Sequence, residues 1–242
     1  MKILVILENA DGRVRSASWS AVEFARQVAT EQDSEVVGLL MGYQIAAVAT
    51  EAASFLPVHV VDDAGLARSL AETQAAVIVQ AVSALGADIV VAATTSWSKD
   101  VVGRAAGSLG GAMAGDVIGH EMVDGILQLR RPVFAGAFVA TVVLKGAPQI
   151  VTVRSAAYAA SPPLEAPATV TALAVMLSPA KGTFVGLEAQ TGGRPDPTEA
   201  AVVVSGGRAI KTAEEFEALI GGLADKLGGA AGSSRALVDA GI

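Results

Sequence analysis

The chain contains 242 residues, of which 52% are hydrophobic and only 4% aromatic. Its formal net charge of −7 argues against binding to nucleic-acid phosphates, so no nucleic-acid partner is expected. It has no cysteine, which excludes disulfides, a thiolate nucleophile and cysteine-bound iron–sulfur or zinc sites. The long uncharged stretches are too short or too polar to span a membrane, so no membrane insertion is expected. A redox role would therefore need a bound organic cofactor.

Strand and helix patterns alternate in the first part of the chain. The apolar run Lys2–Leu7 predicts a buried strand, and the capping-box spacing of Ser20-Ala-Val-Glu23 predicts the start of a helix. The chain enters its first strand without a basic leader, which fits a cytoplasmic bacterial or archaeal protein, or a processed protein of the mitochondrial matrix. Further expected elements are strands over 35–40 and 58–61, a short helix over 45–54 and a long helix from Leu70 that Gly86 ends.

A hydroxyl cluster, Thr94-Thr-Ser96, follows the predicted strand Asp88–Ala93. Open parallel sheets place their ligands at the carboxyl ends of strands, so these hydroxyls could bind a nucleotide. They could equally cap a helix over 99–109. The sequence leaves both interpretations open.

From Val117 to Arg154 the pattern changes to consecutive strands. Asp124-Gly125 is typical of a hairpin turn, and Gly146-Ala-Pro148 predicts another. Arg154 ends the last of these strands, where it could form a surface or interdomain ion pair or contribute to a subunit interface. One more strand is expected over 169–177.

The glycine- and proline-rich segment Gly192–Pro197 predicts a linker between two domains, 1–192 and 198–242. Just after it, the apolar run that starts at Val202 stops at Ser205-Gly206-Gly207-Arg208. This pattern predicts a buried parallel strand that opens into a tight turn with a helix beginning just after it. Gly206 and Gly207 would let backbone N–H groups approach an anion, and Arg208 would add a full charge. Neither the G-x-G-x-x-G spacing nor a Walker lysine is present, so an ordinary turn is the alternative.

The two histidines of the chain suggest no metal site. His59 lies inside an apolar run and His120 lies next to Glu121, and neither has a second ligand at a suitable spacing. No nucleophile elbow is present, and the acidic pairs fall on helix surfaces. The sequence therefore predicts no metal-binding residue and no catalytic residue.

The C-terminal segments Pro195–Arg208, Ala224–Gly228 and Gly232–Gly241 resemble, in order and spacing, the start of the FAD-binding domain of electron transfer flavoprotein alpha subunits. The N-terminal domain of the same subunits is similar at five further segments, Ala92–Asp100, Arg104–Ala106, Gly115–Val117, Arg130–Gly136 and Ile150–Ser155, although Trp97 replaces a glycine that the family often has. The resemblance implies an α/β fold. An open, mostly parallel, nucleotide-binding-like sheet domain with an added β-hairpin region would precede the first part of a Rossmann-like FAD-binding domain.

The resemblance also implies a function. Alpha subunits of this family pair with a beta subunit, hold FAD, and carry electrons from acyl-CoA or other flavin dehydrogenases to a quinone oxidoreductase, without turning over a substrate. Matching positions would make Arg208 a flavin-contacting arginine, Ser234 an FAD-contacting serine, and Arg235 the arginine beside the isoalloxazine. A cation there would stabilise the reduced, negatively charged ring. The alternatives are a nucleotide-binding subunit or a purely structural partner without its own flavin.

The sequence stops at Ile242, where the family continues with segments that supply most of its FAD ligands. The chain is then either a fragment or trimmed product, or a form that has lost its flavin site. The FAD site is therefore expected to be incomplete within residues 198–242, and this chain alone is expected to hold FAD weakly or not at all.

Overall fold

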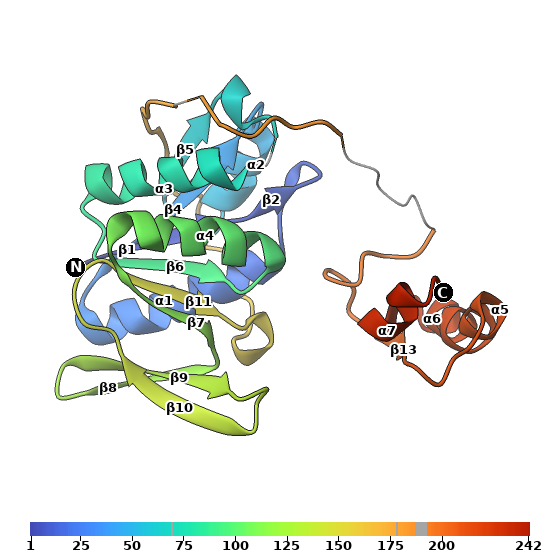
Figure 1. Ribbon diagram of the computed structural model, residues 1–242. Coiled ribbons are helices and arrows are strands. Elements are labelled where there is room, and N and C mark those ends of the chain that lie inside the picture. Colours follow the sequence, from blue (N-terminus) through green and yellow to red (C-terminus); the bar gives the residue numbers. More distant parts are fainter. Residues whose placement is uncertain (69, 178, 187–192) are drawn as a thin grey trace. The chain divides into compact units, whose positions relative to one another are not determined.

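The computed structural model describes residues 1–68, 70–177, 179–186 and 193–242. The chain divides into two compact units, which we call the N-terminal unit (Met1–Phe184) and the C-terminal unit (Val185–Ile242). Figure 1 shows the elements of each unit. The division predicted at Gly192–Pro197 stays a prediction.

A seven-stranded, wholly parallel sheet forms the centre of the N-terminal unit, with strand order β12-β5-β4-β1-β6-β11-β7. This confirms the mostly parallel α/β fold. Apolar, often β-branched runs form its inner strands, as expected for a sheet that is buried on both faces. The strands are β1 (Lys2–Leu7), β4 (Glu35–Gly42), β5 (Val58–Asp62), β6 (Ile89–Ala93), β7 (Ala112–Val117), β11 (Gln149–Val153) and β12 (Val170–Ala172).

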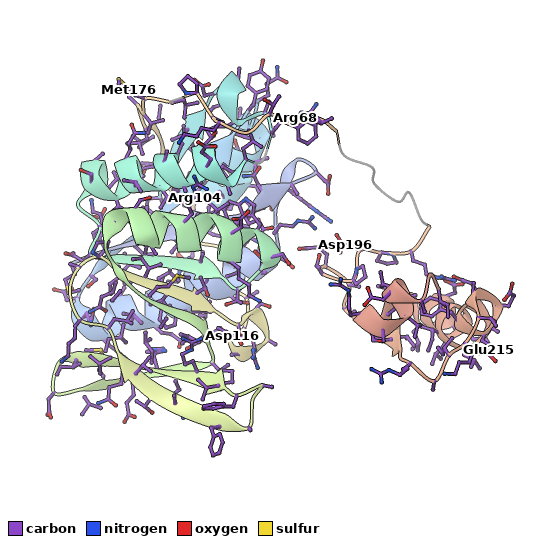
Figure 2. The ribbon with its side chains drawn as sticks, viewed as in Figure 1. Arg68, Arg104, Asp116, Met176, Asp196 and Glu215 are labelled. Carbon is purple, nitrogen blue, oxygen red and sulfur yellow. The ribbon has the colours of Figure 1, made fainter. Side chains whose placement is uncertain are left out.

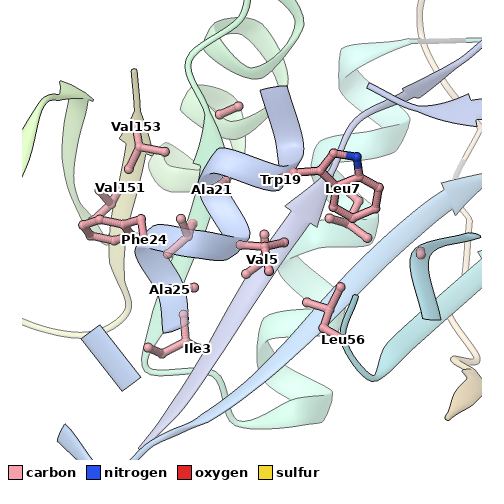
Figure 3. Packing of buried hydrophobic residues seen from close by; sticks show 14 of the residues in the cluster. Ile3, Val5, Leu7, Trp19, Ala21, Phe24, Ala25, Leu56, Val151 and Val153 are labelled. Atoms are coloured by element: carbon pink, nitrogen blue, oxygen red, sulfur yellow. The ribbon is translucent and has the colours of Figure 1, made fainter. Parts of the chain in front are cut away.

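Helices cover both faces of this sheet and create two separate cores, which we call the first core and the second core. On the face that holds the first core, α1 (Ala17–Gln32) and α2 (Ala46–Ala53) pack on alternate residues of β1, which include Val5 (Figure 3). On the face that holds the second core, α3 (Ala71–Leu85) and α4 (Ser96–Leu109) pack on the intervening residues, which include Leu4 and Ile6. A stacked pair, Trp19 and Phe55, with ring centroids 3.8 Å apart, lies on the first face.

The strand order reverses beside β1. Its neighbour β4 leads to one edge of the sheet, and its other neighbour β6 leads to the opposite edge. In open α/β sheets this switch point leaves a crevice at the carboxyl ends of the strands. Two short strands, β2 (Asn9–Ala10) and β3 (Arg13–Val14), form a small hairpin after β1, and a 3₁₀ turn, η1 (Ala64–Leu66), follows β5.

A separate antiparallel sheet carries the predicted hairpin region. It contains β8 (Gly119–Val123), β9 (Ile126–Val133) and β10 (Phe138–Val143) in the order β10-β9-β8. Asp124 and Gly125 both have positive φ, 51° and 75°, and form the expected turn between β8 and β9. The second predicted hairpin turn, at Gly146-Ala-Pro148, is wrong. The chain leaves β10 there and enters β11 in the large sheet, because the apolar run Ile150–Val153 is buried between β6 and β7.

Two other boundaries differ from the prediction. Helix α1 begins at Ala17, so Ser20 is a buried residue of its second turn rather than its cap. The residues before Ser20 are already helical because Trp19 packs against Phe55 and the Ser18 hydroxyl accepts the N–H of Glu8 at 3.1 Å. The strand expected over 169–177 is limited to Val170–Ala172, since Leu173, Val175 and Leu177 pack instead against the second core.

The C-terminal unit contains a two-stranded parallel sheet of β13 (Val203–Gly206) and β14 (Ala230–Ser233). Between the strands, the chain forms one helical segment of α5 (Ala213–Phe216), a π-helical turn η3 (Glu217–Gly221) and α6 (Gly222–Leu227). A short helix, α7 (Arg235–Asp239), follows β14. The parallel strand predicted after Val202 is confirmed as β13, but its predicted burial is wrong, because Val202 and Val203 are 40% and 44% exposed. With one neighbouring strand, β13 has too little protein around it to bury its side chains.

Arg194 ties the start of the C-terminal unit to its helices. Its guanidinium donates two hydrogen bonds to Asp225, at 2.7 and 3.1 Å, and two to Glu217, at 3.1 and 2.7 Å. The guanidinium passes so close to Gly221 that a Cβ there would lie 2.5 Å from Arg194 Nη2. Within the residues that the structure describes, no helix is long and apolar enough to cross a membrane.

Candidate functional site

The parallel pairing of β13 and β14 brings the two predicted cofactor-binding segments together. Gly206 is paired with Ser233, so the segment Gly206–Arg208 and the segment Ser234-Arg235 leave the same edge of the sheet. The N–H of Ser234 donates to the carbonyl oxygen of Gly206 at 3.0 Å. We call this place the carboxyl edge of the small sheet. Parallel sheets of α/β proteins bind ligands at this edge.

The two glycines of the carboxyl edge have different surroundings. A Cβ on Gly206 would lie 2.6 Å from Ile210 Cδ1 and 3.0 Å from Ile220 Cγ1, so Gly206 lets apolar side chains of the C-terminal unit close over β13. At Gly207 no described atom lies within 4 Å of the same position. The backbone of Gly207 is therefore open to a ligand, whereas Gly206 serves the packing of the unit.

Arg208 lies in a turn rather than at a helix start. The turn is closed by the N–H of Ile210, which donates to the carbonyl oxygen of Gly207 at 3.0 Å. The next helix begins only at Ala213, so the prediction of a helix just after the glycines is wrong. Thr212 takes the capping position because its hydroxyl accepts the N–H of Glu215 at 3.1 Å. In the described part of the chain, Arg208 forms no ion pair and keeps its charge available.

Ser234 and Arg235 open the short helix α7. Ser234 has extended backbone angles and precedes the helix, and among the described residues its hydroxyl makes no capping hydrogen bond. Arg235 is largely exposed, and its Nε donates to Asp239 Oδ1 at 2.8 Å, one turn further on. Exposed pairs of this spacing contribute only about 0.3–0.5 kcal/mol. A ligand could therefore draw the guanidinium away from Asp239 at small cost.

The hydroxyls of Thr94–Ser96 serve the fold of the N-terminal unit. The Thr94 hydroxyl donates to Thr152 Oγ1 at 3.0 Å, and that of Thr95 donates to Glu8 Oε2 at 2.6 Å. Thr95 also caps α4 through a reciprocal pair of bonds with Ser98. The capping interpretation is therefore correct, and the helix starts at Ser96 rather than at Lys99.

A hollow of about 390 Å³ lies near these hydroxyls, at the switch point of the large sheet. Its lining includes Glu8 and Asn9 after β1, Tyr43 after β4, and Trp97 on α4, whose indole N–H donates to Gln74 Oε1 at 2.9 Å. Of the described residues that line it, Glu8 alone carries a charge. A nucleotide phosphate would meet a carboxylate there rather than a cation, so the lining does not favour the nucleotide-binding alternative.

Both histidines lie in the N-terminal unit. Burial lowers the pKa of His59, and the nearby Lys2 lowers it further. Burial also lowers the pKa of His120, whose Nδ1 lies 3.2 Å from the Tyr158 hydroxyl, although Glu31 partly opposes the shift. Among the described residues, no group of three or more histidine and acidic side chains could hold a metal ion.

Arg154 forms an ion pair with Asp116, at 3.0 Å from Nε and 2.5 Å from Nη2 (Figure 2 labels Asp116). Both side chains are partly exposed, which fits the surface ion pair considered from the sequence. Its role at a subunit interface stays a prediction. Sequence reasoning missed Arg194 as a structural residue and also missed Arg131, whose Nε is buried without a hydrogen-bond partner among the described residues.

Comparison with known proteins covers nearly the whole chain. Residues 3–178 match the electron transfer flavoprotein domain, and residues 196–242 match the electron transfer flavoprotein FAD-binding domain. A probable mitochondrial electron transfer flavoprotein subunit alpha of Cryptococcus neoformans var. grubii is 34% identical over 98% of this chain and 69% of its own length. The alpha subunit of Pseudomonas aeruginosa is 33% identical over 100% of this chain and 76% of its own. The alpha subunit of Paracoccus denitrificans is 36% identical over 100% of this chain and 76% of its own length. The chain therefore belongs to the family of electron transfer flavoprotein alpha subunits.

Proposed function

We propose that this chain is an electron carrier subunit that holds FAD in its C-terminal unit and works in a complex with an electron transfer flavoprotein beta subunit. The observation that carries the proposal is the placement of Gly207, Arg208, Ser234 and Arg235 at one edge of a parallel sheet, inside the region that matches the family's FAD-binding domain. When bound, FAD would supply the redox chemistry that a chain without cysteine lacks.

The groups at the carboxyl edge fit an anionic cofactor. The open backbone at Gly207 lets a phosphate or ring edge approach the chain closely. Arg208 provides a charge with no ion-pair partner in the described residues, and we assign to it the retention of FAD. Ser234 offers a hydroxyl that helix capping does not use. Arg235 would leave Asp239 and place its charge by the isoalloxazine, where it stabilises the reduced, negatively charged ring.

The surface that we propose for the beta subunit is the antiparallel sheet of β8, β9 and β10. Exposed apolar side chains that gather on a surface mark interaction sites, and several apolar side chains of this sheet are exposed. They are Ile126 (50% exposed), Phe134 (81%), Phe138 (66%), Val139 (57%) and Val143 (44%). A partner that covers one face of this sheet would bury the exposed side chains of that face; Phe138 and Val139, consecutive in β10, point to opposite faces.

The redox partners follow from the same family membership. We propose that flavin dehydrogenases, such as acyl-CoA dehydrogenases, donate the electrons and that a quinone oxidoreductase accepts them. The chain itself would turn over no substrate. The relatives include bacterial proteins and proteins named as mitochondrial, and we propose the bacterial cytoplasm or the mitochondrial matrix as the compartment.

The test is co-expression of the chain with a beta-type subunit, followed by size-exclusion chromatography and flavin absorbance. The chain alone is expected to hold FAD weakly or not at all, so flavin should be recovered with the heterodimer rather than with the chain by itself. Arg208→Ala should lower the flavin that the heterodimer retains on desalting. Arg235→Ala should keep the retained flavin at a lower midpoint potential, because a positive charge beside the reduced ring is gone. Lys226→Ala, on the exposed surface of α6, is the matched control and should change neither property. Separate monomers without flavin would contradict the proposal, and an unchanged potential would remove Arg235 from the site.

A further inference from the structure

An excess of positive charge surrounds Asp116 at the carboxyl ends of β7 and β11. Hydrogen bonds from Arg154 are the main cause that lowers the pKa of Asp116, and the charges of Lys99 and Arg131 also lower it. One carboxylate thus faces three cations, in a chain whose net charge is −7. Arg154 occupies both carboxylate oxygens of Asp116, so among the described residues Arg131 forms no ion pair in this cluster.

Arg131 lies on the face of β9 that is turned toward the first core. Leu127 and Leu129 precede it on the same face of the strand, and both are buried in the first core. The Nε of Arg131 is buried without a hydrogen-bond partner among the described residues. Such groups are rare in folded proteins because they lose hydration without compensation. Arg131 also lines a surface hollow of about 520 Å³, together with Asp116 and Arg154, which we call the Arg131 hollow.

Exposed aromatic side chains stand beside this hollow. The turn between β9 and β10 holds Phe134 and Ala135 at positive φ, 51° and 54°, and Phe134 lines the hollow while remaining 81% exposed. Phe138 contacts it edge to face, with ring centroids 6.0 Å apart. Aromatic residues next to an arginine are the usual composition of the energetically dominant centre of a protein interface.

We propose that the Arg131 hollow receives the carboxylate of an acidic side chain from the protein that covers the β8–β10 sheet. The Arg131 guanidinium would form the paired hydrogen bonds that it lacks in the free chain, and Phe134 and Phe138 would pack against apolar residues of the same partner. A carboxylate suits the hollow because the planar fork of one arginine matches its two oxygens. The inference rests on the proposed function, since the covering protein is then the beta-type subunit.

The test measures the affinity of the chain for the beta-type subunit at low and high salt. Arg131→Met should weaken association at least tenfold and reduce its salt dependence. The same substitution should leave thermal stability unchanged or raised, because the buried Nε without a partner is removed. Arg104→Met, an exposed arginine of α4 labelled in Figure 2, is the matched control and should keep the affinity within about twofold.

A second arm identifies the acid. Each Asp and Glu of the beta-type subunit is changed to Asn or Gln, and one of these changes should weaken binding to the wild-type chain but not to Arg131→Met. Phe134→Ala changes an exposed side chain, so it reports on docking even if Arg131→Met does not fold, and it should weaken binding about tenfold. An affinity within twofold of the wild type for Arg131→Met or for Phe134→Ala would overturn this contact alone. Failure of the wild-type chain to bind would overturn the proposed function with it.

Discussion

Val91 and Val203 lie in strands with the same local pattern but have very different surroundings. Val91 in β6 is 0% exposed, since β1 and β11 flank it and helices cover both faces of the sheet. Val203 in β13 has one neighbouring strand and is 44% exposed. Among the described residues of the C-terminal unit, the buried hydrophobic side chains are Ala224, Ala230 and Leu237. Local sequence thus selects a parallel strand in both units, whereas burial depends on how many neighbours the strand has.

The largest effect that this difference predicts comes from placing a charge in each strand. Val91→Asp should destabilise the N-terminal unit by about 4 kcal/mol or more, because it buries a carboxylate with no partner. Val203→Asp, the matched change in β13, should cost less than about 1 kcal/mol because its side chain already reaches solvent. Amide exchange in urea, read from peptides of each unit, measures both effects. Equal losses would show that β13 is buried more deeply than its exposure indicates.

A smaller effect should separate the two glycines of the carboxyl edge. Gly206→Ala places a methyl group within 2.6 Å of Ile210 Cδ1 and should cost the C-terminal unit about 1–3 kcal/mol through overpacking. Gly207→Ala meets open space and should change stability by less than about 0.5 kcal/mol. The amide protection of β13, β14 and α6, measured in each variant, distinguishes the two substitutions. If Gly207→Ala proves as costly as Gly206→Ala, Gly207 also serves packing, and its assignment to the ligand loses its basis.

Much of the N-terminal fold could be predicted because its signals are local. The apolar run of β1, the ending of α3 at Gly86 in the left-handed conformation, and the Asp124-Gly125 turn each follow from neighbouring residues. The capping-box spacing at Ser20 failed because tertiary packing of Trp19 extends α1 toward its N-terminus. For Thr95, the sequence allowed both helix capping and ligand binding, because a hydroxyl at the end of a strand suits either role.

The parts of the site that escaped prediction depend on contacts between distant segments. Arg194 lies 23 and 31 residues from its two acidic partners, and nothing in its own glycine- and proline-rich surroundings indicates that pairing. The cluster of Asp116, Arg131 and Arg154 forms because β7 and β11 pair in the large sheet while β9 packs beside them. The carboxyl edge was easier to anticipate, because parallel pairing of two strands necessarily brings Gly206 and Ser234 together.

The two units should also respond to different pH ranges. In the C-terminal unit, hydrogen bonds from Arg194 lower the pKa values of Glu217 and Asp225 below their ordinary values of 4.5 and 3.8. Carboxyl groups shifted downward stabilise the folded state above their unfolded pKa, and this contribution is lost as the pH falls through the folded pKa. Amide protection of α6 should therefore fall on acidification below about pH 4.5. Arg194→Gln should lower the amide protection of α6 at neutral pH and remove most of its dependence on pH. An unchanged acid profile would contradict the role assigned to the hydrogen bonds from Arg194.

The smallest effect is expected in the N-terminal unit, at a higher pH. Burial lowers the pKa of His120 below its ordinary value of 6.5, and Arg130 adds to the shift while Glu31 opposes it. Below pH 6.5 the unfolded chain therefore binds more protons than the folded chain, so the stability of the folded state should decrease as the pH falls below 6.5. The pKa of His59 is lowered too. The change in melting temperature between pH 7 and pH 5 should therefore be smaller in His120→Gln than in the wild type, and smaller still when His59→Gln is added. Thermal melts of the full chain, followed by circular dichroism at each pH, measure this change in melting temperature. A wild-type chain that becomes more stable on acidification from pH 7 to pH 5 would show that the attraction of Glu31 for the imidazolium outweighs burial.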